Sequence, residues 1–528
     1  MNPHEGDTPA WQIKASKKRR ECNDRIPKEW LIPQTLWETL PLPLEENKVN
    51  LMELDVIRRT NKYTVASLFA KPSTGEFIAL EVATAYCKRA AVAGQLTLFP
   101  STIARAKELD TMRESGQLKG PLHGLPISVK DCLHVAGTQA TIGFTAYLDQ
   151  LPSDENSCLI DMLLDLGAVR YVKTNVPQTM MTADSENIIF GRALNPWNTT
   201  LTAGRSSGGE GALIALRRSP LGIGTDVAGS IRIPALCCGL YGFKPSACRI
   251  PNSRQQEYGT GGLRTIYGSV GPLANDIDAL EILTRAVLRA NSRPAVYDLG
   301  VLDTPWREIG PTKPRLRFGF LLVDPTFPLH PPVRAALEEA AFRLGEAGHE
   351  IVPLPAEECH IPYSLEVVWK VVAQGGEPPI ASRAVIERLA KELGLRFVPG
   401  FEDRTPLERL STLNVKPGEI IKNWHTLWRK YDLDAVICPP APNTAVERDM
   451  YGLTPYTSFL NLLDYPACVI PFRRAGKFPM PRGKKGNNGR LLEGAPCSVQ
   501  VFTSRVRAEE CLAISKVVDR CLHGDVTT

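Results

Sequence analysis

The stretch Thr202-Ala-Gly-Arg-Ser-Ser-Gly-Gly-Glu-Gly211, followed after an apolar run by Gly224-Thr-Asp-Val-Ala-Gly-Ser-Ile-Arg-Ile-Pro234, is the most informative part of this chain of 528 residues. Both halves are rich in glycine, and they carry Ser206 and Ser230, 24 positions apart. Glycines let backbone N–H groups approach a ligand, and such groups can stabilise the oxyanion of a tetrahedral intermediate. The stretch therefore predicts that Ser230 is a nucleophile within a loop of backbone donors.

Ser206 and Ser207 precede the apolar run after Gly208, where we expect a helix to begin. Serines in this position are most often helix N-caps, and Ser230 taken alone is most often a turn serine. The pattern Gly-x-Ser-x-Gly over 204–208 also fits the nucleophile elbow of α/β-hydrolases. That elbow must follow a buried strand, whereas residues 195–202 are polar and turn-like. The residues alone leave these alternatives open.

A lysine ends the apolar strand candidate in Gly124-Leu-Pro-Ile-Ser-Val-Lys-Asp131. Burying an ammonium group is costly, and burial lowers the pKa of lysine until the amine can act as a base near neutral pH. Serine–lysine arrangements are a known variant of the catalytic triad. The alternative is that Lys130 is a surface residue paired with Asp131.

Together these three segments resemble the amidase signature family. The resemblance covers roughly residues 60–520 and is strongest over 120–275. Its specificity comes from the combination of Ser-Ser-Gly-Gly-Glu, Gly-Thr-Asp-x-x-Gly-Ser-Ile-Arg-x-Pro and the upstream Gly-Leu-Pro-Ile-Ser-x-Lys-Asp. Flanking segments such as Val172-Lys-Thr-Asn-Val-Pro-Gln178 and Phe459-Leu-Asn-Leu-Leu-Asp464 are similar to those of fungal acetamidase-type general amidases.

The resemblance implies a hydrolase that cleaves a carboxylic, non-peptide amide to an acid and ammonia or an amine, through an acyl-enzyme. It implies a Ser–cis-Ser–Lys triad, in which Ser230 is the nucleophile, Ser206 the relay on a cis peptide and Lys130 the base. It requires no cofactor and no metal. The backbone of Val227, Ala228, Gly229 and Ser230 is expected to form the oxyanion hole.

Two positions depart from the family pattern. Ala228 stands where the family usually has glycine; it keeps its N–H, so the hole survives unless the position needs a positive φ. Arg205 replaces the glycine that usually precedes the paired serines. An arginine beside Ser206 could narrow the pocket or favour an anionic substrate, so we expect Arg205 and Ser206 to contact the substrate. The resemblance implies that Met181 also lines the site. Either departure could instead weaken catalysis.

Strand and helix patterns alternate through the chain, which predicts an α/β fold with a parallel or mixed sheet. The resemblance specifies this as an amidase-signature α/β/α sandwich, with a large central mixed sheet covered by helices on both faces. We expect residues 1–60 to form an N-terminal helical extension and 61–528 a single domain. The expected strands are 126–130, 169–172, 316–323, 351–354, 435–438, 467–470 and 498–501, and the expected helices include 78–92, 159–166, 333–344 and 508–521.

Composition limits the classes of partner. The net charge is only +5, too small to imply nucleic acid or a membrane surface. Thirteen cysteines without a Cys-x-x-Cys pair favour reduced thiols in a cytoplasmic protein. The eight histidines form no metal-binding pattern. We expect no membrane anchor and a small-molecule amide as substrate, and a homodimer is compatible with the sequence.

Two other functions stay open. One is an amidotransferase-type subunit, which would need an ammonia source and partner subunits. The other is a catalytically weak family member that serves as a pathway accessory or binding protein, which the changes at Ala228 and Arg205 would favour. The sequence does not distinguish a small aliphatic amide from a secondary-metabolite intermediate as substrate.

Overall fold

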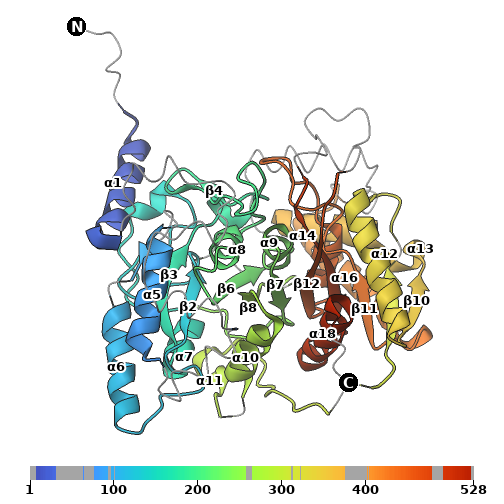
Figure 1. The fold of residues 1–528 in the computed structure, drawn as a ribbon. Helices are drawn as coiled ribbons and strands as arrows, with labels where there is room; N and C mark the ends of the chain where they lie inside the picture. The colour runs from blue at the N-terminus through green and yellow to red at the C-terminus, as the bar shows by residue number, and fades with distance from the viewer. Residues whose placement is uncertain are drawn as a thin grey trace.

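A computed structural model describes residues 8–30, 64, 77–92, 97–99, 101–256, 265–289, 291–310, 313–321, 323–374, 401, 403–477 and 492–524. Its centre is a sheet of eleven strands (Figure 1). The strands follow one another across the sheet in the order β1 (Thr97–Leu98), β3 (Val169–Thr174), β2 (Pro126–Lys130), β6 (Leu221–Asp226), β8 (Ser269–Ala274), β7 (Tyr241–Lys244), β12 (Ala467–Arg474), β13 (Pro496–Phe502), β11 (Ala435–Cys438), β9 (Arg317–Leu321) and β10 (Glu350–Leu354).

The sheet is mixed, as predicted. Strand β2 is parallel to both of its neighbours, β3 and β6, and β9 is parallel to β10 and β11. The other neighbouring pairs are antiparallel. All seven predicted strands are present within this sheet, with small differences in their ends.

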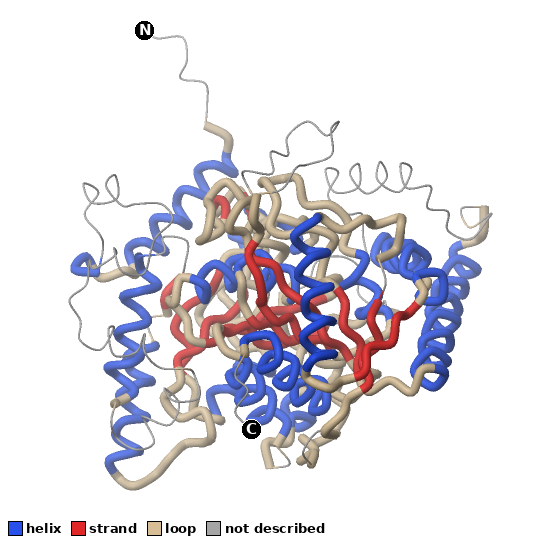
Figure 2. Tube along the Cα trace, turned by 45° about the vertical axis from the view of Figure 1, so that its right-hand side comes forward, coloured by secondary structure: helices blue, strands red, loops and turns tan. Residues whose placement is uncertain are grey.

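Helices cover both sides of the sheet, which runs through the middle of the molecule (Figure 2). Helices α5 and α6 pack against β3, α10 against β8, and α18 against β12. The helices are α1 (Ala10–Asp24), α5 (Ala79–Val92), α6 (Thr102–Glu114), α7 (Cys158–Asp165), α8 (Gly208–Ala215), α9 (Arg232–Cys238), α10 (Ile277–Leu288), α11 (Pro294–Tyr297), α12 (Pro331–Glu346), α13 (Ala356–Cys359), α14 (Ile361–Gln374), α16 (Pro406–Lys430), α17 (Pro455–Leu462) and α18 (Ala508–His523).

The predicted α/β/α architecture is therefore confirmed. None of the helices in the described part of the chain combines the length and apolar character needed to cross a bilayer.

The N-terminal helix α1 contacts a loop region of the main body. Lys18 is buried and donates to Gln139 Oε1 at 2.9 Å, and Arg19 donates to the carbonyl of Ile189 at 2.9 Å. Most of the rest of the predicted extension, up to residue 60, lies outside the described residues. The division at residues 60/61 stays a prediction.

Two adjacent parallel strands bring the predicted catalytic residues together. Strand β2 ends at Lys130, and its neighbour β6 ends at Asp226, directly before the loop 227–230. Carboxyl ends of parallel strands meet at one edge of the sheet, where α/β proteins commonly bind ligands. Helix α8, which Ser206 and Ser207 precede, packs against both strands.

Candidate active site

Lys130 is fully buried at the end of β2 and points at Ser206. Its Nζ lies 2.6 Å from Ser206 Oγ and 2.7 Å from Thr225 Oγ1. Burial lowers the pKa of Lys130 to about 8, although the nearby Cys132, Asp226 and Glu210 oppose this shift. A lowered pKa increases the fraction of the amine that is neutral near physiological pH.

The alternative that Lys130 is a surface lysine paired with Asp131 is wrong. The partner of Asp131 is Lys173, whose Nζ lies 3.4 Å from Asp131 Oδ1. Asp131 also accepts hydrogen bonds from the backbone of Thr141 and Ile142. The hydrogen-bond partners of Lys130 are therefore the hydroxyl groups of Ser206 and Thr225 and the carbonyl of Thr225.

Ser206 lies in the turn that enters α8, and Ser207 occupies the N-cap position of that helix. The Ser207 hydroxyl makes no capping bond and donates instead to the carbonyl of Thr225, at 3.4 Å. The nucleophile-elbow alternative loses its structural basis. In the described structure, residues 195–203 before this turn form isolated bridges and no strand.

Ser230 closes the loop after β6 and is 6% exposed. Within the described residues, its hydroxyl makes no hydrogen bond, whereas Ser206 is bonded to Lys130. The structure thus joins two of the three predicted triad members directly. The third, Ser230, lies on the loop that follows the neighbouring strand, with its hydroxyl available for reaction.

The backbone N–H groups of the loop 227–230 differ in whether they are hydrogen-bonded. The N–H of Gly229 donates to Asp226 Oδ1 at 2.8 Å. In the described structure, the N–H groups of Val227, Ala228 and Ser230 have no acceptor. Three of the four predicted oxyanion-hole donors are therefore unbonded, and the fourth is used to hold the loop.

The departure at Ala228 does not strain the loop. Ala228 is absent from the residues with positive φ, whereas Gly229 has φ +107°. The position that needs glycine is therefore 229, and Ala228 keeps its N–H in an ordinary conformation.

A buried ion pair holds this loop in place. Asp226 and Arg232 are both 0% exposed and lie 3.0 Å apart. Arg232 Nε and the backbone N–H of Ile231 also donate to Asp226. These contacts hold the pKa of Asp226 well below its usual range, against the effect of burial, so the carboxylate stays ionised. Asn461 on α17 donates to the same carboxylate at 3.0 Å.

Glu210 is a second buried acidic residue whose charge acts on Lys130. Its carboxyl group accepts from Ser128 Oγ at 2.6 Å and from Thr174 Oγ1 at 2.7 Å. Burial raises its pKa to about 7. The neighbouring strand must pass very close, because a Cβ on Gly222 would lie 2.0 Å from Glu210 Oε2.

Arg205 is 4% exposed and contacts the loop rather than solvent. Its Nη1 donates to the carbonyl of Ala228 at 3.0 Å and to Thr454 Oγ1 at 2.8 Å. Met181 is half-buried after the short 3-10 turn Gln178–Met180. A role of Arg205 and Met181 in binding substrate stays a prediction.

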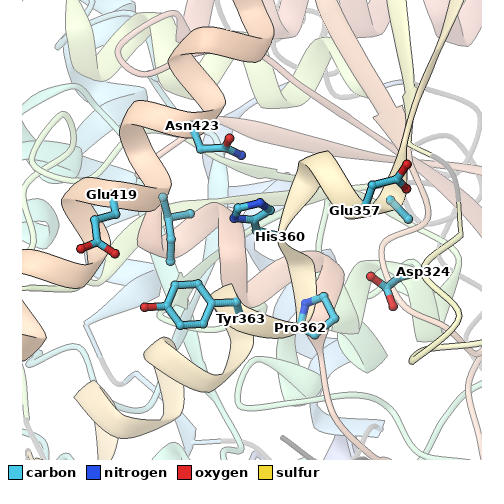
Figure 3. Close-up of a pocket in the computed structure, with 9 residues that line it drawn as sticks. Asp324, Glu357, His360, Pro362, Tyr363, Glu419 and Asn423 are labelled. Atoms are coloured by element: carbon cyan, nitrogen blue, oxygen red, sulfur yellow. The ribbon is translucent and has the colours of Figure 1, made fainter. Parts of the chain in front are cut away.

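A cavity of about 550 Å³ lies elsewhere, between α13, α14 and α16 (Figure 3). None of the predicted site residues lines it. In the described part of the chain, no group of His, Cys, Asp and Glu side chains could hold a metal ion. The residues lining the cavity include Asp324, Glu357, His360, Tyr363, Glu419 and Asn423.

Comparison with known proteins identifies the family of this chain. The family model described as Amidase matches residues 81–512. An amidase of Gibberella moniliformis is 35% identical, with 96% of this chain and 98% of the relative covered. The chain belongs to the amidase family. It is an amide-hydrolysing enzyme.

A further relative and a solved structure are also similar to this amidase. An acetamidase of Emericella nidulans is 32% identical, with 98% of this chain and 99% of the relative covered. The solved structure of a fatty acid amide hydrolase matches with a TM-score of 0.84 at 25% identity, covering 97% of this chain and 95% of that one. The fold of this amidase is thus that of an amidase-signature enzyme.

Several supporting residues of this amidase were not found from the sequence. Asp226, Glu210 and Arg232 stand inside the quoted motifs, and a charged residue in so apolar a context was the available signal. Thr454, Thr457 and Asn461 gave no such signal, because they reach the loop from more than 200 positions away in the chain.

Proposed function

We propose that this amidase hydrolyses a carboxylic amide through an acyl-enzyme on Ser230, with Ser206 as proton relay and Lys130 as base. The observation that carries the proposal is the 2.6 Å separation between the buried, lowered-pKa amine of Lys130 and the hydroxyl of Ser206. At this separation a neutral amine can accept the Ser206 proton, whichever atom donates in the resting enzyme.

The proposed steps balance protons as follows. Ser230 Oγ attacks the amide carbon while its proton passes to Ser206, and the proton of Ser206 passes to Lys130. The C–N bond then breaks as the Lys130 ammonium returns a proton through Ser206 to the leaving nitrogen, which departs as ammonia or an amine. Water, deprotonated along the same route, releases the acid and regenerates Ser230.

The unbonded N–H groups of Val227, Ala228 and Ser230 support this proposal. Backbone donors that are already in place can stabilise the tetrahedral oxyanion without reorganisation. Removal of one such donor typically lowers kcat by about 10²–10³-fold. No step requires a metal or cofactor. A cis peptide at Ser206 belongs to the proposal as the family resemblance implies it.

We propose a small linear amide as the substrate class, in keeping with the relatives named amidase and acetamidase. A cytoplasmic location is supported by the cysteines, since no disulfide joins any of them in the described structure. An amidotransferase-type subunit and a catalytically weak accessory protein are the competing functions.

The test is covalent labelling with a fluorophosphonate probe and peptide mapping, followed by ammonia release from acetamide, hexanamide and benzamide and by nitroaniline release from 4-nitroacetanilide. We expect a label on Ser230 that is lost in Lys130→Ala, and hydrolysis by the isolated chain. A label on Ser206 would contradict the assigned roles. Absence of both label and hydrolysis from the folded chain would favour the accessory protein.

A further inference from the structure

A single peptide unit in the oxyanion loop, between Ala228 and Gly229, is held at both ends. Its carbonyl oxygen accepts from Arg205 Nη1 at 3.0 Å, Thr454 Oγ1 at 3.2 Å and Thr457 Oγ1 at 3.3 Å. Its N–H donates to Asp226 Oδ1 at 2.8 Å. The C=O and N–H of a trans peptide point in opposite directions, so these two sets of partners fix the plane of the unit.

The orientation of this plane decides what the loop presents to a substrate. Rotation by half a turn would exchange the carbonyl and the N–H, and a carbonyl dipole facing a developing oxyanion would repel it. The unbonded N–H groups of Ala228 and Ser230 belong to the two flanking peptides, and their directions depend on the same backbone dihedrals. A glycine at position 229, with φ +107°, gives the unit little resistance of its own to rotation.

Arg205 is the charged member of the set that holds the carbonyl. It is 4% exposed, and among the described residues no carboxylate forms a direct ion pair with it. The charge of Asp226 acts on Arg205, but that carboxylate is paired with Arg232. A buried guanidinium without a counter-ion is costly, and hydrogen bonds from a charged donor are about twice as strong as those between neutral groups. Its own backbone is fixed too, since the Arg205 carbonyl accepts from Ser185 Oγ at 2.6 Å.

The position of Arg205 in the chain links this clamp to the relay. Arg205 directly precedes Ser206, whose hydroxyl contacts Lys130. Its side chain reaches the loop of Ser230 and, through Thr454, the N-terminal end of α17. One residue therefore joins the turn of the relay serine to the loop of the nucleophile.

We propose that Arg205 is a positioning residue for catalysis, which holds the Ala228–Gly229 peptide so that the oxyanion loop keeps its donors toward the reacting carbonyl. This inference rests on the proposed function. Arg205 would then contribute to stabilising the transition state. Replacing it should change kcat more than KM, because the loop stabilises the planar ground-state amide less than it stabilises the tetrahedral intermediate.

The experiment compares Arg205→Met, Arg205→Lys and Thr454→Val with Arg218→Met, using whichever of the four amides above is hydrolysed fastest. Arg218 is a matched control, since it is also buried and donates to a main-chain carbonyl, that of Arg89, at 2.7 Å. We expect Arg205→Met to lower kcat by about 10- to 100-fold, while KM changes by less than about 3-fold. The loss is smaller than the roughly 10²–10³-fold typical of removing an oxyanion-hole donor itself, because Arg205 acts on the donors only through the Ala228–Gly229 peptide. Arg205→Lys should recover part of this loss, because a charged donor group remains, although without the planar shape of the guanidinium.

A second readout separates positioning from stability. A trifluoromethyl ketone probe forms a tetrahedral adduct with the nucleophile, and its affinity should fall in parallel with kcat across the Arg205 variants. Arg218→Met should lower the melting temperature and leave kcat and probe affinity within about 2-fold. If Arg205→Met melts lower yet keeps kcat and probe affinity, the residue is only structural and the inference is wrong.

The outcomes also distinguish this inference from the proposed function. If the unaltered chain hydrolyses none of the amides and is not labelled, the proposed function fails. If it is active and Ser230→Ala is not, but Arg205→Met and Thr454→Val match it in kcat, only the present inference fails. Should Arg205→Met not fold, Arg205→Lys and Thr454→Val decide, each with an expected loss of kcat at nearly constant KM.

Discussion

Gly229 and Thr457 touch so closely that a Cβ added to Gly229 would lie 2.4 Å from Thr457 Oγ1. The oxyanion loop is thus packed directly against α17, which starts at Pro455 and arrives from a distant part of the chain. The loop has no space on this side, and its shape depends on the helix as much as on its own glycine.

We expect Gly229→Ala to lower kcat/KM by at least about 100-fold, because the new methyl group meets Thr457 and the positive φ strains any other residue. The rate of fluorophosphonate labelling should fall with it. Gly268→Ala is the control: its Cβ would lie 3.4 Å from Val227 Cγ2, an ordinary contact. Full activity in Gly229→Ala would show that the loop's shape is unimportant.

Restoring the family's usual residue with Ala228→Gly should change kcat/KM by less than about 3-fold. Ala228 has no positive φ and keeps its N–H, so glycine brings no new donor and adds only flexibility. Steady-state kinetics on the same amide decide the matter. A gain of 10-fold or more would mean that Ala228 impairs this enzyme, as an accessory role would require.

The pH dependence of kcat/KM should report the Lys130 amine. In the proposed mechanism the neutral amine is the active form, so activity should rise with pH through about 8, its lowered pKa, and be lost below it. The charged or titratable groups that act on this amine are Cys132, Asp226, Glu210 and Arg205.

Glu210→Gln should move this acid limb to lower pH. The Glu210 carboxylate favours the ammonium form, so its removal lowers the pKa of Lys130 further. Glu155→Gln serves as a control, because Glu155 is exposed and paired with Arg254. A limb that stays in place, or moves to higher pH, would contradict the assignment of Lys130 as the base.

Asp226→Asn should lower the free energy of unfolding by about 3–5 kcal/mol, the usual cost of breaking a fully buried ion pair. It leaves Arg232 without its carboxylate and weakens the bond to the N–H of Gly229. Urea unfolding followed by circular dichroism would measure this. The double variant Asp226→Asn/Arg232→Met should lose less than the sum of the two single variants; strict additivity would argue against the pair.

Seven strands of the sheet and several helices followed from the sequence because their apolar patterns are continuous. Strand β2 was predicted with its observed ends, and helix α5 begins one residue from its predicted start. Strand β6, next to β2 in the sheet, was not predicted as a strand. Its glycines resemble a loop, and they are there because Glu210 and Ser207 pack against Gly222 and Gly224.

The sequence motifs predicted the triad candidates. They did not predict most of the residues that contact these candidates and their loop. Burial of Lys130 followed from an apolar strand that ends in a lysine. The contacts that hold the Ala228 carbonyl did not, since Thr454 and Thr457 lie 226 and 229 positions away in the chain. The hydrogen bonds of Arg205 to the loop and to Thr454 were not predicted either, and its expected contact with the substrate stays a prediction.

The crowding around the motif glycines has a consequence for how such chains are classified. A side chain at Gly222 would meet Glu210, and one at Gly209 would lie 2.3 Å from the carbonyl oxygen of Asn175. These glycines are needed for the fold whether or not the enzyme is active. A descendant that lost its chemistry would therefore retain most of the signature, and changes at the proposed triad of Lys130, Ser206 and Ser230 would be a better record of the loss than the glycines.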